Sequence, residues 1–137
     1  MNWTKGEYTI STDRSLLDLD TIHGFLKTSY WANERSREQI ECTIENSICF
    51  GLYKGDRQIG FARIVTDEAA ISWLGDVFVL PEFQRNGLGK WLVQCVTEHP
   101  IVKQTRCLLG TQDAHGLYEQ YGWERREMMF RPEDGSG

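Results

Sequence analysis

The sequence predicts a mixed α/β (α+β) fold in a single domain over residues 1–137, with a mostly antiparallel central sheet flanked by about four helices. Three observations lead to this prediction. Two short helical patterns follow the first β-prone run, three β-prone runs joined by short turns occupy the middle, and helical and β-prone patterns alternate afterwards. The 137 residues, with five Trp, six Phe and five Tyr, suffice for one hydrophobic core but not for two domains. We expect the order β-α-α-β-β-β-α-β-α-β.

The first part of the chain predicts one strand and two helices. Residues 8–12 alternate in a β-prone pattern, which is typical of a strand. Residues 19–26 place their apolar side chains on one helical face, and either Asp18 or Asp20 can serve as the N-cap. Residues 36–46 begin with the Ser-x-x-Gln spacing of a capping box and predict a second short helix.

An antiparallel meander occupies the middle of the sequence. Residues 48–54 and 58–66 are β-prone and are separated by a Gly-Asp pair suited to a two-residue hairpin turn. Asp67 and Glu68 form the next turn, and residues 70–80 form a long strand that a proline ends. This strand delivers the chain to a glycine-rich loop.

The remaining sequence alternates between helix and strand. A helix with apolar residues at helical spacing follows the glycine-rich loop and ends at a His-Pro pair. Residues 106–111 predict a short strand buried on both faces, and residues 114–121 predict a helix that a glycine terminates. Residues 123–131 predict the last strand, and residues 132–137 a disordered tail.

The glycine-rich loop, residues 84–90, predicts an anion site. A strand, a glycine loop and a helix in succession aim several backbone N–H groups at one point, where the helix dipole adds partial positive charge. Gly87 and Gly89 lack a Cβ, so a phosphate can approach the backbone closely. The spacing excludes a P-loop, since no four-residue spacer separates the glycines, and it excludes the dinucleotide fingerprint, since Leu92 replaces the third glycine.

Two motifs then carry a resemblance to a known family. Residues 84–89, Gln-Arg-Asn-Gly-Leu-Gly, resemble the Q/R-x-x-G-x-G/A motif of the GCN5-related N-acetyltransferases (GNAT), and residues 117–123 resemble the family's Y-x-x-x-G-F. The expected element order is similar to that family over almost the whole chain. Segments 29–32, 76–81 and 113–118 further resemble a small single-domain subgroup without an assigned substrate.

The resemblance implies that acetyl-CoA is bound, with coenzyme A as the product and no metal. In the family, the strand before the loop exposes backbone groups to pantetheine, and the loop holds the pyrophosphate. Where many relatives carry an asparagine that contacts the cofactor, this chain has a threonine, which retains only part of that hydrogen bonding. The residues concerned are Val77, Phe78 and Val79 for pantetheine, Arg85, Asn86, Gly87, Leu88, Gly89 and Lys90 for pyrophosphate, and Thr111.

Three residues are candidates for the chemistry. The resemblance makes Tyr118 the general acid that protonates the departing thiolate, although it could also be a packed helix tyrosine. Asp76 is the first candidate for the general base, because burial in an apolar strand would raise its pKa; it could equally be a structural acceptor of hydrogen bonds from backbone N–H groups. His115 is the second candidate, or it could belong with Asp113 to a helix cap.

The acceptor pocket is expected to include Tyr30, Trp31 and Trp73, since the loop between the first two helices lines that pocket in the family. Two large rings could also simply anchor the loop in the core. The resulting function is acetyl-CoA-dependent N-acetyl transfer to a primary amine of a small molecule by direct attack. Alternatives are a non-catalytic acyl-CoA-binding module, a protein N-terminal or lysine acetyltransferase, and an interaction domain without cofactor.

Composition limits the partners and the location. The formal net charge of −5 argues against nucleic-acid binding, and no membrane span or secretory signal is visible, so we expect a cytoplasmic monomer or homodimer. The four cysteines show no C-x-x-C pair or metal-ligand spacing, which predicts reduced thiols and no metal. Cys95 and Cys107 lack a base partner, so an acetyl-cysteine route is less favoured than direct attack.

Overall fold

A six-stranded sheet in the order β1-β2-β3-β4-β5-β6 runs through the computed structural model, which describes residues 1–134. Neighbouring strands are antiparallel except β5 and β6, which are parallel. The predicted α+β class with a mostly antiparallel sheet is therefore confirmed. The strands are β1 (Asn2–Lys5), β2 (Tyr8–Ser11), β3 (Ile48–Lys54), β4 (Arg57–Thr66), β5 (Ile71–Val79) and β6 (Arg106–Leu108).

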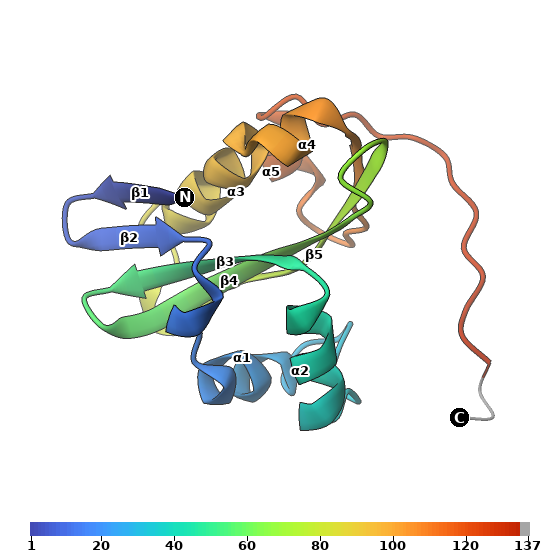
Figure 1. Cartoon of the computed structure of the whole chain (residues 1–137). Helices are drawn as coiled ribbons and strands as arrows, with labels where there is room; N and C mark the ends of the chain where they lie inside the picture. The colour runs from blue at the N-terminus through green and yellow to red at the C-terminus, as the bar shows by residue number, and fades with distance from the viewer. Residues whose placement is uncertain (135–137) are drawn as a thin grey trace.

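Helices cover both faces of this sheet (Figure 1). The helices are α1 (Leu19–Leu26), α2 (Arg37–Glu45), α3 (Leu88–Glu98), α4 (Pro100–Gln104) and α5 (His115–Glu119), with 3-10 turns at Arg14–Leu16 and Pro81–Phe83. One core lies between the sheet and α3, α4 and α5, and a second, smaller core lies between the sheet and α1 and α2. Within residues 1–134, no helix is long and apolar enough to cross a membrane.

The predicted start signals of the first two helices are confirmed. The Asp18 carboxylate accepts hydrogen bonds from the first backbone N–H groups of α1, and Ser36 Oγ accepts one from Gln39 N at the start of α2. The Ser36 cap lies at the end of the loop that contains residues 27–35, which connects α1 to α2. That loop carries the aromatic pair expected at the acceptor pocket.

Two elements escaped the sequence patterns. Strand β1 is mostly polar and shows no apolar alternation, yet it pairs with β2 through a turn in which Gly6 has a φ of 60°. Helix α4 begins directly where the chain was expected to leave its helix, because Pro100 is favoured at a first helical position and His99 Nδ1 accepts a hydrogen bond from Ile101 N. The His-Pro pair thus ends α3 and also starts α4.

The end of the chain differs most from expectation. The predicted strand at residues 123–131 is wrong, because this segment pairs with no strand and its residues from 124 onward are exposed. Strand β6 covers only the first half of the predicted 106–111 and is exposed or half-buried rather than buried on both faces. Of the expected tail, residues 132–134 have no regular structure and 135–137 lie outside the described residues.

Candidate functional site

The N-terminus of α3 presents a row of unused hydrogen-bond donors. None of the backbone N–H groups of residues 85–90 donates to an acceptor within residues 1–134, and the first helical bond runs from Trp91 N to Gly87 O. Arg85 and Gly87 have positive φ angles of 69° and 75°, and these two left-handed residues form the turn that leads into α3. Both Arg85 and Lys90 are exposed. This geometry suits an anion such as a phosphate.

Strand β5 leaves part of one edge open beside this row. Its pairing with β6 ends at Trp73 and Leu108, so from Gly75 onward no strand pairs with that edge of β5 in the described chain. A β-bulge sits at the same point, since Asp76 and Val77 together lie opposite Ala62 of β4. One short loop joins the open edge of β5 to the free N–H groups of residues 85–90. A ligand that carries both amide and phosphate groups can therefore contact both.

The side chains of the three residues expected to contact pantetheine belong to the two cores. Val77 and Val79 pack on the α3 side, whereas Phe78 stacks on Phe25 of α1 with ring centroids 4.1 Å apart. Only their backbone groups can therefore serve a ligand. Gln84 Nε2 donates to Val79 O at 2.8 Å, which occupies the last carbonyl of the strand and ties the glycine-rich loop to it.

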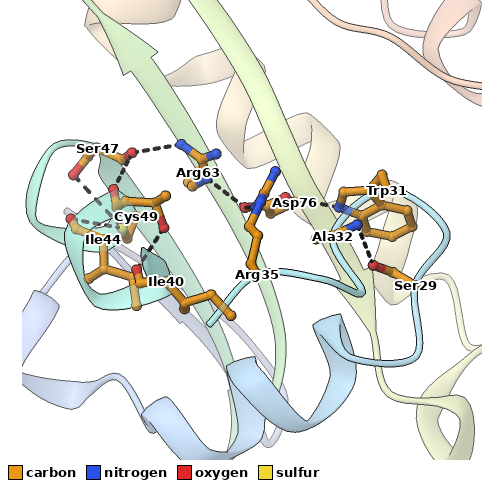
Figure 2. Close-up of polar contacts among 11 residues, drawn as sticks. Ser29, Trp31, Ala32, Arg35, Ile40, Ile44, Ser47, Cys49, Arg63 and Asp76 are labelled. Atoms are coloured by element: carbon orange, nitrogen blue, oxygen red, sulfur yellow. Dashed lines mark hydrogen bonds and ion pairs between the residues drawn. The ribbon is translucent and has the colours of Figure 1, made fainter. Parts of the chain in front are cut away.

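Asp76 is the centre of a buried ionic cluster (Figure 2). Its Oδ2 accepts hydrogen bonds from Arg35 Nη1 at 2.7 Å and from Arg63 Nε at 2.6 Å, and its Oδ1 accepts one from Trp31 Nε1 at 2.9 Å. Arg63 also donates to Ser47 Oγ. The exposed fraction of the side chain is 2% for Asp76, 12% for Arg63 and 24% for Arg35.

The expectation that burial gives Asp76 the pKa of a base is wrong. Burial does act to raise this pKa, but the charges and hydrogen bonds of Arg63 and Arg35 together outweigh it, and the pKa of Asp76 is lowered. A carboxylate that is already shared by two guanidinium groups is a poor proton acceptor. The backbone at Asp76 is also unusual, with a φ of 53° at the bulge. The cluster ties the loop after α1 to the bulge, which is a positioning role.

Tyr118 in α5 is buried, with 8% of its surface exposed, and its ring contacts Trp123 edge-on at 5.8 Å. Burial, together with the negative charge that nearby Tyr30 can carry, raises the pKa of Tyr118 to about 12. The phenol is therefore protonated at neutral pH and can donate a proton.

The start of α5 holds the other two candidates from this part of the chain. Thr111 Oγ1 accepts hydrogen bonds from Ala114 N at 3.0 Å and, less favourably, from Asp113 N at 3.4 Å. Thr111 thus orders the turn that precedes α5, and only its hydroxyl proton remains for a ligand. His115 is half-buried and lies three residues before Tyr118, so both side chains emerge on the same side of the helix.

The three aromatic residues expected at the acceptor pocket do not form one group. Tyr30 and Trp31 contact each other edge-on at 5.1 Å, and the charge that Tyr30 can carry contributes, after burial, to the raised pKa of Tyr118. Trp73 makes no ring contact with the pair in residues 1–134; it lines a separate hollow of about 350 Å³ with Leu108 and Met128.

The cysteines are free thiols, as predicted. Burial raises the pKa of Cys95 to about 12 and the pKa of Cys107 to about 11. Both thiols are therefore protonated at neutral pH, which argues against a covalent acetyl-cysteine intermediate. No group of three potential metal ligands forms among His, Cys, Asp and Glu side chains of residues 1–134.

Sequence reasoning missed Arg35 and Arg63 as partners of Asp76. A signal for Arg63 did exist, because an arginine within the apolar β4 run and an aspartate within the apolar run of β5 can pair across two neighbouring strands. Arg35 gave no such signal, since it lies in a loop 41 residues away from Asp76.

Comparisons with known proteins identify relatives of the chain. A family model described as "Acetyltransferase (GNAT) domain" matches residues 45–125. The curated protein "Putative acetyltransferase FG08082" of Gibberella zeae is 33% identical over 117 residues, a match that covers 71% of this chain and 66% of that protein. The chain thus spans slightly less than two thirds of that relative's length.

Solved structures agree with this match. A crystal structure from Xanthomonas campestris, described as "a putative acetyltransferase belonging to the gnat family", has a TM-score of 0.87 and 40% identity, covering 91% of this chain and 92% of that chain. An acetyltransferase structure from Deinococcus radiodurans has a TM-score of 0.77 and 20% identity, covering 97% and 94% of the two chains. The second of these supports the fold alone.

Proposed function

The chain belongs to the GNAT acetyltransferase family, and we propose that it transfers the acetyl group of acetyl-CoA to the primary amine of a small molecule. The observation that carries this proposal is the row of free N–H groups at residues 85–90, directly after the open edge of β5. The pyrophosphate of acetyl-CoA would bind to these N–H groups, and its amide-containing pantetheine arm would bind along the open edge of β5. Val77, Phe78 and Val79 would contribute backbone groups only.

The reaction proceeds by direct attack in this proposal. The amine nitrogen attacks the thioester carbonyl carbon, a C–N bond forms, and the C–S bond breaks. The departing sulfur takes the proton of the Tyr118 hydroxyl, which is available because the phenol has a pKa of about 12. The nitrogen loses one proton, so an amide and a free thiol result. Holding both substrates side by side supplies much of the acceleration.

His115 is the proposed acceptor of the amine proton. Asp76 is engaged with two arginines, whereas His115 makes no hydrogen bond within residues 1–134 and shares a helix side with Tyr118. We expect His115→Gln to lower kcat/KM about 100-fold at pH 7 without changing acetyl-CoA affinity. Glu119→Gln, an exposed change in the same helix, is the control. An unchanged kcat/KM in His115→Gln would mean that water, and not His115, accepts the proton of the amine.

The donor site is tested by adding one methyl group at Gly87. Gly87 has a φ of 75°, a left-handed conformation that costs alanine about 1–2 kcal/mol, and a Cβ built there meets nothing within 4 Å. The same methyl group occupies space beside the row of amides. We expect acetyl-CoA to bind at least 10-fold more weakly to Gly87→Ala, as measured by calorimetry. Gly55→Ala, in the turn between β3 and β4 with a φ of 59° and nothing near its Cβ, should lose similar stability and bind normally.

The whole proposal is tested by following free thiol during incubation with acetyl-CoA and a panel of amines. The panel contains polyamines, amino acids, aminoglycosides, small aromatic amines and a peptide with a free N-terminus. Thiol release that depends on one small amine supports the proposal. Binding of acetyl-CoA without thiol release from any acceptor would instead favour an acyl-CoA-binding module, and release only with the peptide would favour a protein acetyltransferase.

A further inference from the structure

The ionic cluster around Asp76 carries more positive than negative charge. It joins one carboxylate to the guanidinium groups of Arg35 and Arg63, and no other carboxylate of residues 1–134 forms an ion pair with either arginine. Largely buried charges are usually paired one to one, because an uncompensated charge is costly away from water. The excess is notable in a chain whose formal net charge is −5. An anion from outside the chain would neutralise it.

Arg35 is the member of the cluster that can still bind such an anion. Its Nη1 donates to Asp76, whereas its Nε and Nη2 donate to no acceptor within residues 1–134, and 24% of its side chain is exposed. Arg63 is only 12% exposed and already donates through Nε to Asp76 and through Nη1 to Ser47. A guanidinium group presents its N–H donors in a planar fork, which matches the two oxygens of a carboxylate.

The position of Arg35 relates it to the reaction. Its partner Asp76 lies at the bulge, where the open edge of β5 begins, and the far end of that edge leads to the free N–H groups of residues 85–90. With the pyrophosphate of acetyl-CoA at those N–H groups, the pantetheine arm runs back along β5, and the thioester end comes toward Asp76. Arg35 and Trp31 reach Asp76 from the same loop (Figure 2).

We propose that Arg35 binds a carboxylate of the acceptor, and that the acceptor is an amino acid or another small amine with one carboxylate. This inference rests on the proposed function, because it names the class of amine that the same site takes. One carboxylate neutralises the cluster, whereas a phosphate monoester, with a charge of about −1.5 to −2 at pH 7, would reverse its sign. The rings of Tyr30 and Trp31, 54% and 38% exposed, offer the rest of the acceptor an apolar surface on the same loop.

The variant Arg35→Gln separates recognition of the acceptor from stability of the fold. Without Arg35, Asp76 still pairs with Arg63, and the remaining ion pair is neutral, so the variant should fold. Arg37→Gln is the matched control, because it removes the same charge two residues along the chain. Arg37 pairs with Asp20 at the surface, where the two side chains are 45% and 80% exposed.

The test follows free thiol with acetyl-CoA and glycine, leucine, phenylalanine or lysine, each measured beside its own C-terminal amide. The amide keeps the amine and replaces the carboxylate with a neutral group. We expect wild type to have a higher kcat/KM for at least one amino acid than for its amide, and Arg35→Gln to lower that ratio about 10-fold or more. A general loss of activity lowers both rates and leaves the ratio unchanged. Arg37→Gln should keep the wild-type ratio, and Arg35→Lys should restore part of it.

Two results would overturn this proposal while acetyl transfer itself stands. The first is thiol release with amines but no preference for any amino acid over its amide. The second is a preference that Arg35→Gln leaves unchanged. The absence of thiol release with every amine would instead count against the proposed function, and calorimetry then decides the role of Arg35. The same amino acids are titrated into protein saturated with coenzyme A: binding that Arg35→Gln weakens about 10-fold supports carboxylate recognition, and no binding contradicts it.

Discussion

Replacing Asp76 with asparagine is expected to lower the free energy of unfolding by about 3–5 kcal/mol, the usual effect of removing one partner from a buried ion pair. Asparagine keeps the size of the side chain, so packing is preserved. The substitution removes the negative charge that compensates Arg35 and Arg63. The side chains of these arginines are only 24% and 12% exposed. Two like charges then face each other across a neutral group.

The measurement is urea unfolding at pH 7, with Asp20→Asn as the control. Asp20 pairs with Arg37 at 2.7 Å, but 80% of the Asp20 side chain is exposed, so its loss should hardly change stability. A similar small change in both variants would show that the Asp76 cluster contributes no more than a surface pair. The cluster holds the loop of Tyr30 and Trp31. We therefore also expect Asp76→Asn to raise the KM for the amine by a larger factor than the KM for acetyl-CoA.

The pH dependence of stability distinguishes the loss of this ion pair in Asp76→Asn from the loss of hydrogen bonds alone. The folded pKa of Asp76 lies below its ordinary value of 3.8, so its stabilisation is complete above that pH and is lost as pH falls through the folded pKa. The variant lacks this contribution, so the two proteins should converge in stability in acid. Asp67, whose pKa is lowered to about 2 mainly by backbone hydrogen bonds, affects both proteins equally. A difference that stays constant down to pH 2 would contradict the ion-pair account.

The cluster also shows where sequence reasoning stopped. Polar interruption of an apolar strand draws attention to Asp76, but the sign of its pKa shift depends on Arg63, 13 residues away, and Arg35, 41 residues away. Local patterns contain no information about which charges a fold brings together. The caps of α1 and α2, which involve neighbours within three residues, could be read directly from the sequence.

Strand prediction follows the same rule. Strand β3 was predicted to its last residue, because its apolar run and the Gly-Asp turn are local signals. Strand β1 is stabilised by pairing with β2 rather than by its own polar residues, and residues 123–131 are β-prone without a partner. β-propensity describes how well a segment fits a sheet, and the sheet itself must supply the edge.

Replacing Tyr118 with phenylalanine is expected to lower kcat about 10²–10⁴-fold, the range that general acid catalysis contributes, while acetyl-CoA affinity changes little. The change removes one hydroxyl and keeps the ring that contacts Trp123 edge-on at 5.8 Å. The hydroxyl has no hydrogen-bond partner in the described part of the chain, so the fold should not depend on it. The variant separates a proton donor from a packed aromatic ring.

The pKa of Tyr118 gives this prediction a second readout. With a folded value of about 12 against an ordinary 10, the neutral phenol is favoured by folding, so stability is lost as pH rises above 10. Tyr118→Phe removes that loss, and the variant should be relatively more stable at pH 11 than at pH 8. Tyr53, with a pKa also raised to about 12 by burial, contributes equally to both proteins.

Steady-state rates and acetyl-CoA binding are compared in Tyr118→Phe and in Tyr121→Phe, a control that removes the same atom three residues along the chain. Because the phenol stays protonated to about pH 11, wild-type activity should show no decline from Tyr118 between pH 7 and 10. We expect only the change at position 118 to lower kcat. An unchanged kcat in Tyr118→Phe would mean that water protonates the departing thiolate, and Tyr118 would then be a packing residue whose raised pKa only reflects its burial.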